Sequence, residues 1–301
     1  MASAITSRVQ RRSDSSASWY FLLLPLFILL AVIEFYPVIV GVDLSLTNAA
    51  GQFSFGNYVQ MVNDPALYTA IEVSLSYSII STVLCVLIGL GLTFLVTQKV
   101  RGRSVFEAIY IFPMALSPII AGVLWSPSSI WDDLFTFTHS FFGLPYVDEL
   151  SPVFYFPVMT FSEAWLWSPL IMLVALSVIK SQAKQVSEAA EVHGASDWKR
   201  FTMISLPTVL RSPVMQFIIV LRLIDALRAF EIPLAWSNWV GFQSSIGSPV
   251  DTLSLFLYKL IFVPLYHFPI GLVSAIGVIL LALTLVFAFA LIRLLGRIGG
   301  R

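Results

Sequence analysis

Six long apolar stretches divide this chain, and they constrain its fold more than any other feature. They cover residues 19–42, 70–96, 105–125, 153–179, 214–235 and 269–295. An α-helix rises about 1.5 Å per residue, so about 20 apolar residues cross the roughly 30 Å hydrocarbon layer of a bilayer. Because backbone groups in lipid must be satisfied within their own segment, helices are favoured. The sequence therefore predicts an all-α, polytopic membrane protein with six transmembrane helices.

The composition supports the same conclusion. Hydrophobic residues make up 58% of the 301 residues, charged residues make up 11%, and the mean hydropathy is +0.88. A soluble domain of this size has no way to bury so much apolar surface. The first apolar stretch carries Pro25, Glu34 and Pro37 and is longer than the core of a signal peptide, so we expect an uncleaved span in the lipid bilayer.

Basic residues are distributed unevenly among the connections. All but three of the 17 Lys and Arg residues lie in the N-terminal tail, near residue 100, in the segment 180–211, or near the C-terminus; the exceptions are Arg222, Arg228 and Lys259. Basic residues are retained on the cytoplasmic side. We therefore expect a multi-pass protein of the cell (inner or cytoplasmic) membrane with both termini in the cytoplasm, and with the connections 126–152 and 236–268 outside.

This orientation divides the chain into four expected parts. Residues 1–18 form a cytoplasmic tail, and residues 19–69 form the first transmembrane helix and an external loop. Residues 70–295 form a transmembrane core of five helices, within which residues 181–212 form a cytoplasmic loop. Residues 296–301 form a second cytoplasmic tail.

The polar segment between the fourth and fifth apolar stretches has a distinctive pattern. Good helix formers are followed by Gly194 and then by an apolar-periodic run with Pro207 and Pro213, which predicts a helix–turn–helix. Four positions at three- and four-residue spacing form a small, mildly apolar helical face: Val186, Ala189, Ala190 and His193. So short a helix cannot bury itself within its own loop, and we expect it to dock into a groove on a partner.

This segment resembles the cytoplasmic signature, or EAA loop, of ABC-importer permeases. The matching residues are Glu188, Ala189, Ala190, Gly194, Ala195, Ile204, Leu206 and Pro207. His193 stands where the family usually has Asp, and His tolerates a left-handed backbone. The resemblance implies that residues Glu188, Ala189, Ala190, Gly194, Ala195, Leu206 and Pro207 couple this chain to ATPase subunits. The alternative is an ordinary surface loop between two spans.

Other patches are similar to the sugar-permease branch of that family. They are Tyr36-Pro37 with residues 44–46, residues 55–58 with Asp64-Pro65, and the run 225–231, in which Leu227 and Glu231 are mild departures. The resemblance covers nearly the whole chain. It implies one permease subunit of a sugar importer, whose partners are a second, homologous permease, two ABC ATPase subunits and an extracellular or periplasmic solute-binding protein.

Charged residues within the apolar stretches mark a candidate cargo path, because such residues usually face a bundle interior or a water-filled passage. In the fifth stretch, charges of alternating sign recur every three residues, at Arg222, Asp225, Arg228 and Glu231. Such residues can pair along one helix face. Two interpretations stay open: this face lines the path, or its charges neutralise one another against a partner helix.

The fourth stretch offers a carbohydrate-like pair. Glu163 and Trp167 are four residues apart and share a helix face. A carboxylate accepts hydrogen bonds from sugar hydroxyls, and an indole offers a flat apolar surface. The alternative for a tryptophan is an interfacial aromatic belt, which we expect for Trp165 and Trp236. We expect the cargo to contact six residues of the two stretches: Glu163, Trp167, Arg222, Ile224, Asp225 and Arg228.

Several other functions lack sequence support. There is no Gly-x-x-x-x-Gly-Lys phosphate loop, so we expect ATP hydrolysis in partner subunits, no cofactor, and no enzymatic activity in this chain. The three histidines match no metal spacing, the single Cys85 permits no internal disulfide, and nothing suggests nucleic-acid binding. Two alternatives remain: a permease for glycerol phosphate or another polyol, with Arg222 or Arg228 meeting a phosphate, and a secondary transporter, which the absence of repeated halves disfavours.

Overall fold

The computed structural model describes residues 16–98, 102–126, 131–143, 145, 151–181, 189–263 and 268–299. Within these ranges the regular elements are helices, and one isolated bridge joins Thr47 and Phe53. Four helices are long and apolar enough to cross a membrane: Leu23–Ser45, Pro65–Thr97, Val153–Ser181 and Ile270–Arg293. The all-α, polytopic class is therefore confirmed, while the number of six spans stays a prediction.

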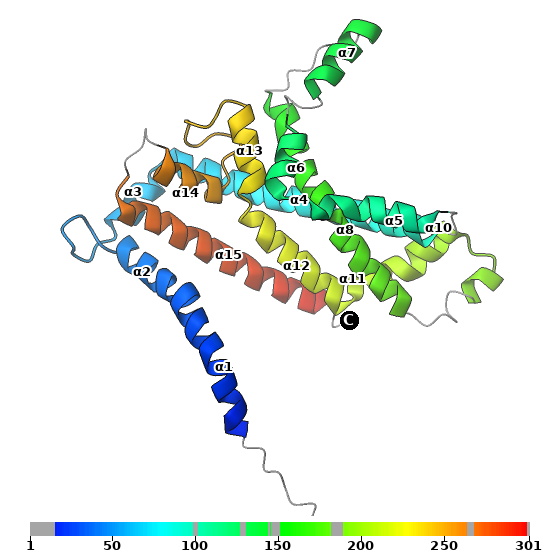
Figure 1. Cartoon of the computed structure of the whole chain (residues 1–301), viewed down its shortest axis with the longest axis horizontal. Helices are drawn as coiled ribbons and strands as arrows, with labels where there is room; N and C mark the ends of the chain where they lie inside the picture. The colour runs from blue at the N-terminus through cyan, green and yellow to red at the C-terminus, as the bar shows by residue number, and fades with distance from the viewer. Residues whose placement is uncertain are drawn as a thin grey trace, which may run out of the picture.

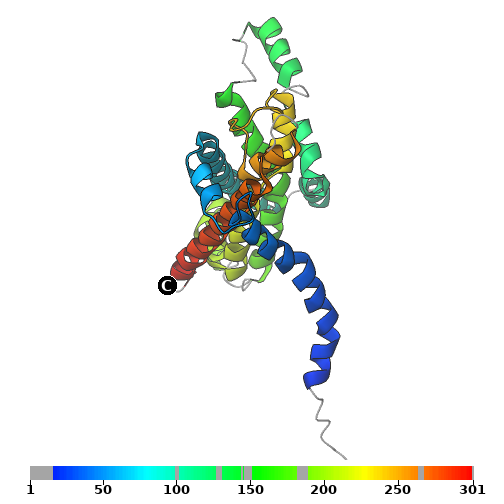
Figure 2. The ribbon, with the colours of Figure 1, turned by 90° about the vertical axis from the view of Figure 1, so that its left-hand side faces the viewer.

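The first apolar stretch forms one long helix that stands apart from the rest of the chain. It consists of α1 (Ser16–Leu30), a π-helical turn (Ala31–Phe35) and α2 (Tyr36–Ser45). Side chains from Leu23 onward are mostly exposed, and α2 packs against the last long helix, α15 (Ile270–Gly299). Figures 1 and 2 both show α1 extending away from the other helices.

The centre of the molecule is the pair formed by α4 (Pro65–Thr97) and α8 (Pro152–Ser181), which pack along much of their length. Asp64 caps α4, because its carboxylate accepts from the backbone N–H of Ala66 at 2.9 Å, and a proline follows at the first helical position. Gly89 permits the close approach of the two helices, since a Cβ there would lie 2.5 Å from Cβ of Ile171.

The third apolar stretch is bent rather than continuous. It forms α5 (Arg103–Ile111), a 3₁₀ turn (Phe112–Ala115) and α6 (Pro118–Leu124), with an angle of 103° between its two parts. Each proline lacks a backbone donor, and Pro118 forces the residue before it out of the helical region. The expected single span at residues 105–125 is thus a bent pair, and α6 packs against α8 and α13 (Glu231–Trp239).

The fifth apolar stretch is broken. It begins as α12 (Pro213–Leu227), leaves the helical conformation at residues 228–230, and resumes as α13. The segment 236–268, expected to be a loop, contains the end of α13 and the short apolar helix α14 (Leu253–Phe262). The other expected loops also hold short helices, namely α3 (Gly56–Val62) and α7 (Asp132–Phe142), and Figures 1 and 2 show α7 standing away from the body.

Candidate functional site

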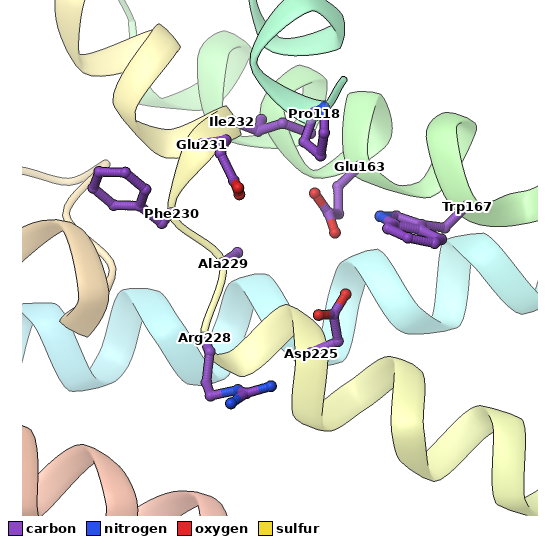
Figure 3. Close-up of a pocket in the computed structure, with 9 residues that line it drawn as sticks. All are labelled: Pro118, Glu163, Trp167, Asp225, Arg228, Ala229, Phe230, Glu231 and Ile232. Atoms are coloured by element: carbon purple, nitrogen blue, oxygen red, sulfur yellow. The ribbon is translucent and has the colours of Figure 1, made fainter. Parts of the chain in front are cut away.

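A polar pocket lies where α8 faces the break between α12 and α13. Its volume is about 160 Å³, and nine residues line it: Pro118, Glu163, Trp167, Asp225, Arg228, Ala229, Phe230, Glu231 and Ile232. Figure 3 shows the carboxylates of Glu163, Asp225 and Glu231 pointing toward a common space beside the Trp167 indole. The structure thus brings together Glu163, Trp167, Asp225 and Arg228, four of the six predicted path residues.

Arg222 lies behind the pocket, and carboxylates engage both of its terminal nitrogens, while its buried Nε has no partner. Its guanidinium forms ion pairs with Glu163 of α8 and with Asp225 one turn along α12, and its side chain is only 2% exposed. It also lies over the Trp167 ring, with Cζ 5.2 Å from the ring centroid. The buried cation is therefore compensated on two sides by carboxylates and on a third by an aromatic face.

Glu163 is also buried, and both of its carboxylate oxygens have protein partners. Its side chain is 6% exposed; Oε1 accepts from Arg222, and Oε2 accepts from the Tyr77 hydroxyl of α4 at 3.2 Å. The Arg222–Glu163–Tyr77 group thus connects α12, α8 and α4. Because Glu163 already has these partners, the carboxylates most available to a ligand are those of Asp225, whose side chain is 55% exposed, and Glu231, which is also exposed.

The break explains which of the expected charges share a face. Arg222 and Asp225 pair at the predicted three-residue spacing, but α12 ends at Leu227, so Arg228 and Glu231 do not continue that helix face. These two residues reach the pocket from the break instead. Ile224 is half-buried and is not among the residues that line the pocket. Tyr77 was not expected in the site, since a tyrosine within an apolar stretch resembles any other core aromatic residue.

The expectation of an interfacial belt is wrong for Trp236. This residue is completely buried in a core cluster with Tyr77 and Tyr155. Trp165 is half-buried and packs edge-on against Trp125, with ring centroids 5.5 Å apart. The break places α13 against α6, and this position turns the Trp236 indole inward rather than toward a membrane surface.

The EAA-like segment folds as a helix, a turn and a second helix. Glu188 lies outside the described residues, whereas residues 189–192 are helical and include Ala189 and Ala190. Gly194 ends this helix with φ of +78°, a conformation that other residues rarely adopt. The backbone N–H of Ala195 closes the turn by donating to the Ala190 carbonyl at 3.0 Å. A positive φ at Gly194 is the conformation that a glycine C-cap predicts.

The second half of the segment is anchored to the membrane helices. It consists of α10 (Asp197–Arg200), a π-helical turn (Phe201–Ser205) and α11 (Leu206–Arg211), with Pro207 in the first turn of α11. Leu206 packs against a core cluster that includes Ile171 of α8. Arg200 forms ion pairs with Glu191 (2.8 Å) and Asp197, and the hydrogen bond to Asp197 is the main cause that raises the pKa of Arg200. The ion pair between Arg200 and Glu191 therefore joins the two halves of the EAA-like segment.

The outer surface of this segment is apolar at two points. Val192 is 85% exposed and Trp198 is 60% exposed.

Within the described residues, no group of three or more His, Cys, Asp or Glu side chains is arranged to hold a metal ion.

No protein-family model matches the chain. Several transport proteins are nevertheless similar to it over nearly its whole length. The trehalose/maltose transport system permease protein MalF of Thermococcus litoralis is 27% identical over 301 residues, which cover 97% of this chain and 98% of the relative. The arabinooligosaccharides transport system permease protein AraP of Bacillus subtilis is 26% identical, over 95% of this chain and 91% of the relative.

A third relative and a solved structure agree with these two. The trehalose transport system permease protein SugA of Mycobacterium tuberculosis is 25% identical, over 98% of this chain and 94% of the relative. The fold matches a chain of a bacterial ABC transporter involved in the import of the acidic polysaccharide alginate, with a TM-score of 0.79, 21% identity, and coverage of 95% of this chain and 97% of that one. These relatives confirm the predicted resemblance of this chain to the permease subunits of sugar ABC transporters.

Proposed function

We propose that this chain is one permease subunit of an ATP-driven importer for a neutral sugar or oligosaccharide, and that the pocket beside Glu163 and Asp225 forms part of the cargo path. The observation that carries the proposal is this pocket, in which an indole lies beside carboxylates next to a helix long enough to cross a membrane. Carboxylates accept hydrogen bonds from sugar hydroxyls, and the indole face packs against a sugar ring. The similar MalF, SugA and AraP proteins support a sugar as cargo.

The charge of the pocket favours a neutral cargo over an anionic one. Three carboxylates line it, on Glu163, Asp225 and Glu231, but only one basic side chain, that of Arg228. The two terminal nitrogens of Arg222 are committed to ion pairs, and its Nε is buried without a partner, so Arg222 presents no accessible donor to a phosphate. With Arg222 counted, the three carboxylates still outnumber the two basic side chains, so an anion would meet a net negative charge. This charge balance disfavours glycerol phosphate, and it separates the proposed cargo from an acidic polysaccharide such as alginate.

A second permease subunit would complete the path. Asp225, Arg228 and Glu231 are exposed on this chain although they line the pocket. Charged side chains are costly against lipid and usually face a partner or a water-filled passage. The homologous second subunit fits this role, since it would enclose the pocket from the side that this chain leaves open.

The EAA-like segment would transmit the action of the two ATPase subunits. Its outer surface carries the exposed Val192 and Trp198, whose apolar side chains suit a groove on a soluble partner. Its inner end is Leu206, packed against the α8 cluster, while α11 leads directly into α12. A displacement of this segment by the ATPase subunits would therefore move both α8 and α12, the helices that carry pocket residues.

The test is reconstitution of the complete transporter in liposomes with its solute-binding protein. We expect uptake of radiolabelled trehalose or maltose to require ATP hydrolysis, and excess glycerol 3-phosphate to leave that uptake unchanged. Sugar uptake that is driven by an ion gradient without ATP would establish a secondary transporter instead. Preferential uptake of glycerol 3-phosphate would refute the neutral cargo.

A further inference from the structure

The break between α12 and α13 involves three carbonyl groups, of which only that of Phe230 keeps its usual helical partner. Such groups must be satisfied when the surroundings exclude water. The Phe230 carbonyl accepts from the N–H of Leu234, at the start of α13, at 2.8 Å. The other two carbonyls, of Arg228 and Ala229, accept from side chains that lie more than twenty residues further along the chain.

Two hydroxyls at the start of α14 satisfy those carbonyls. Thr252 donates to the Ala229 carbonyl at 2.7 Å, and Ser254 donates to the Arg228 carbonyl at 3.0 Å. Thr252 is completely buried, and its Oγ1 also accepts from the N–H of Leu255 at 3.3 Å, so it is the N-cap of α14. The N-terminus of α14 therefore holds the backbone of the pocket-lining break.

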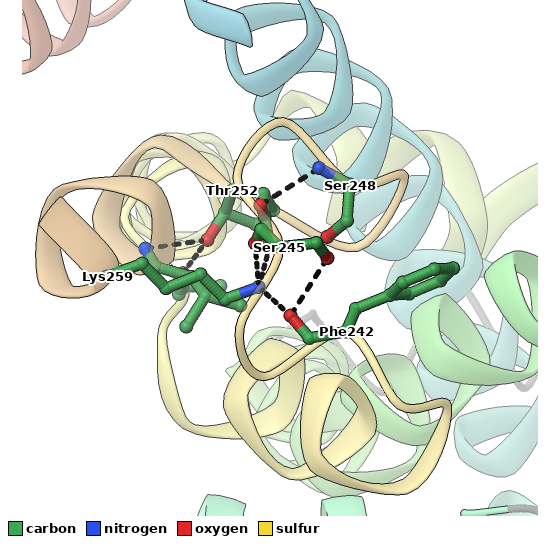
Figure 4. Close-up of polar contacts among 8 residues, drawn as sticks. Phe242, Ser245, Ser248, Thr252 and Lys259 are labelled. Atoms are coloured by element: carbon green, nitrogen blue, oxygen red, sulfur yellow. Dashed lines mark hydrogen bonds and ion pairs between the residues drawn. The ribbon is translucent and has the colours of Figure 1, made fainter. Parts of the chain in front are cut away.

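A buried ion pair fixes this helix start in turn. Lys259 and Asp251 have side chains that are 2% and 0% exposed, with Nζ 2.6 Å from Oδ1. The Lys259 ammonium also donates to the carbonyls of Phe242 (2.6 Å) and Ser245 (3.1 Å), so all three of its N–H groups have acceptors. Figure 4 shows the Lys259 side chain extending toward Phe242 and Ser245, whose carbonyls accept from its ammonium.

The second oxygen of Asp251 closes the same loop. Oδ2 accepts from the N–H of Ser248 at 3.0 Å, and the N–H of Leu253, two residues after Asp251, donates to Ser74 Oγ of α4 at 2.7 Å. The connection between α13 and α14 is thus folded around one ammonium and joined to α4. Its position relative to the break is defined by specific bonds rather than by apolar contact alone.

We propose that Thr252 and Ser254, held in place by the Asp251–Lys259 ion pair, are positioning residues for the cargo pocket. They hold the carbonyls of the break in one arrangement, which sets where Arg228 and Glu231 enter the pocket. The inference rests on the proposed function only for the identity of that pocket as a cargo path. It also links the connection 240–252, on the expected external side, to the site that receives the cargo.

Hydrogen exchange of the intact chain in lipid nanodiscs tests the positioning without any cargo. Thr252→Val removes the hydroxyl at nearly constant volume, and we expect amides in residues 226–236 to exchange about tenfold faster because the half-buried Ala229 carbonyl loses its donor. Ser254→Ala should have a smaller effect of the same kind, and Thr252→Ser should exchange as the wild type does. The matched control is Thr284→Val, which removes a hydroxyl bond of the same length, 2.7 Å, made within one turn of α15 to the Leu280 carbonyl.

The ion pair needs a variant that leaves no charge stranded. Lys259→Met alone would bury an uncompensated carboxylate and lower the folded yield. The double variant Asp251→Asn with Lys259→Met removes both charges, and we expect it to raise exchange in residues 226–236 as Thr252→Val does. Unchanged exchange in both Thr252→Val and this double variant would overturn the inference.

Transport kinetics connect the positioning to the cargo. In the reconstituted transporter, we expect Thr252→Val to raise the KM for trehalose about fivefold while the maximal rate stays within about twofold, because the pocket is misplaced but coupling is intact. Faster exchange with an unchanged KM would show that the hydroxyls do not position the cargo. If the wild type transports neither trehalose nor maltose while the exchange result holds, the proposed function fails and the role of the hydroxyls in fixing the break stands.

Discussion

Arg222 determines the charge balance of the pocket, because it is the buried cation that two carboxylates and one indole surround. Breaking a buried ion pair by removing one partner costs about 3–5 kcal/mol, whereas replacing both partners with apolar residues is often neutral. We therefore expect Arg222→Met or Glu163→Met alone to lower the thermal stability of the purified complex. The double variant should recover much of the loss.

Asp225 provides the comparison for this first prediction. Its side chain is 55% exposed, so the Asp225–Arg222 pair should contribute only about 0–1 kcal/mol. Asp225→Asn is then expected to change the melting temperature little. A double Arg222→Met, Glu163→Met variant that is no more stable than either single variant would show that the buried pair does not connect α8 and α12 in the assembled protein.

Trp167 has two contacts to lose, one to Arg222 and one to the proposed cargo. Stacking of an aromatic ring on a ligand contributes about 1–3 kcal/mol, so Trp167→Ala should raise the KM for sugar uptake roughly tenfold or more while Trp167→Phe retains part of the affinity. Trp239→Ala is the matched control, since Trp239 is 47% exposed and does not line the pocket. Equal uptake kinetics in Trp167→Ala and Trp239→Ala would argue against sugar contact at this indole.

Among the helices, the close packing of α4 against α8 depends on the absence of a side chain at Gly89. At Gly89 a Cβ would lie 2.5 Å from Ile171 Cβ and 2.7 Å from the Ser168 carbonyl, so Gly89→Ala must push the helices apart. Overpacking of this kind costs about 1–3 kcal/mol. We expect a lower yield of folded protein in detergent, measured by size-exclusion chromatography. Gly91→Ala, two residues away in open space, should give the wild-type yield.

The helix at residues 189–192 of the EAA-like segment ends at Gly194, where the backbone is left-handed. A β-branched residue at φ of +78° costs about 1–2 kcal/mol in strain, so Gly194→Val should distort the turn between residues 189–192 and α10. We expect sugar-stimulated ATPase activity of the complex to fall while membrane insertion is normal. The control is Gly143→Val, at the end of α7, where φ is +64° and no atom lies within 4 Å of an added Cβ. Equal activity in both variants would place the coupling elsewhere.

Long helices were predictable from the sequence, and their interruptions were not. The stretches expected at residues 70–96 and 153–179 correspond to α4 and α8, because a long apolar segment in lipid satisfies its own backbone hydrogen bonds by forming a helix. Proline alone does not predict a bend, since α8 continues through Pro157 and Pro169 while α5 and α6 are separated near Pro118. The break at residues 228–230 itself contains neither Pro nor Gly, but Pro233 of α13 has no N–H to donate to the Ala229 carbonyl four residues earlier. The hydroxyls that satisfy the break come from α14.

At the scale of the whole molecule, the sequence predicted which site residues share a helix face, but not which residues of different helices meet in the site. Helical spacing alone placed Glu163 with Trp167 and Arg222 with Asp225. The pairing of Arg222 with Glu163 joins residues 59 positions apart, so it depends on how α8 and α12 are rotated against each other. Periodicity carries no information on that rotation, and for the same reason neither Tyr77 nor the burial of Trp236 was foreseen.

The orientation of the whole chain in the membrane is the remaining prediction, and it follows from the basic residues near residue 100, in the segment 180–211 and at both ends. Single cysteines on a Cys85→Ala background report it, because the native Cys85 is buried. Val192→Cys and Phe141→Cys are suitable sites, since the native side chains are 85% and 72% exposed. In intact cells, we expect a membrane-impermeant maleimide to label position 141 and to leave position 192 unlabelled. Cells dissolved in denaturing detergent, which removes any docked subunit, should show labelling at both positions, and this controls for reactivity. Labelling of position 192 in intact cells would place the EAA-like segment outside, away from ATP, and would overturn both the orientation and the proposed coupling to ATPase subunits.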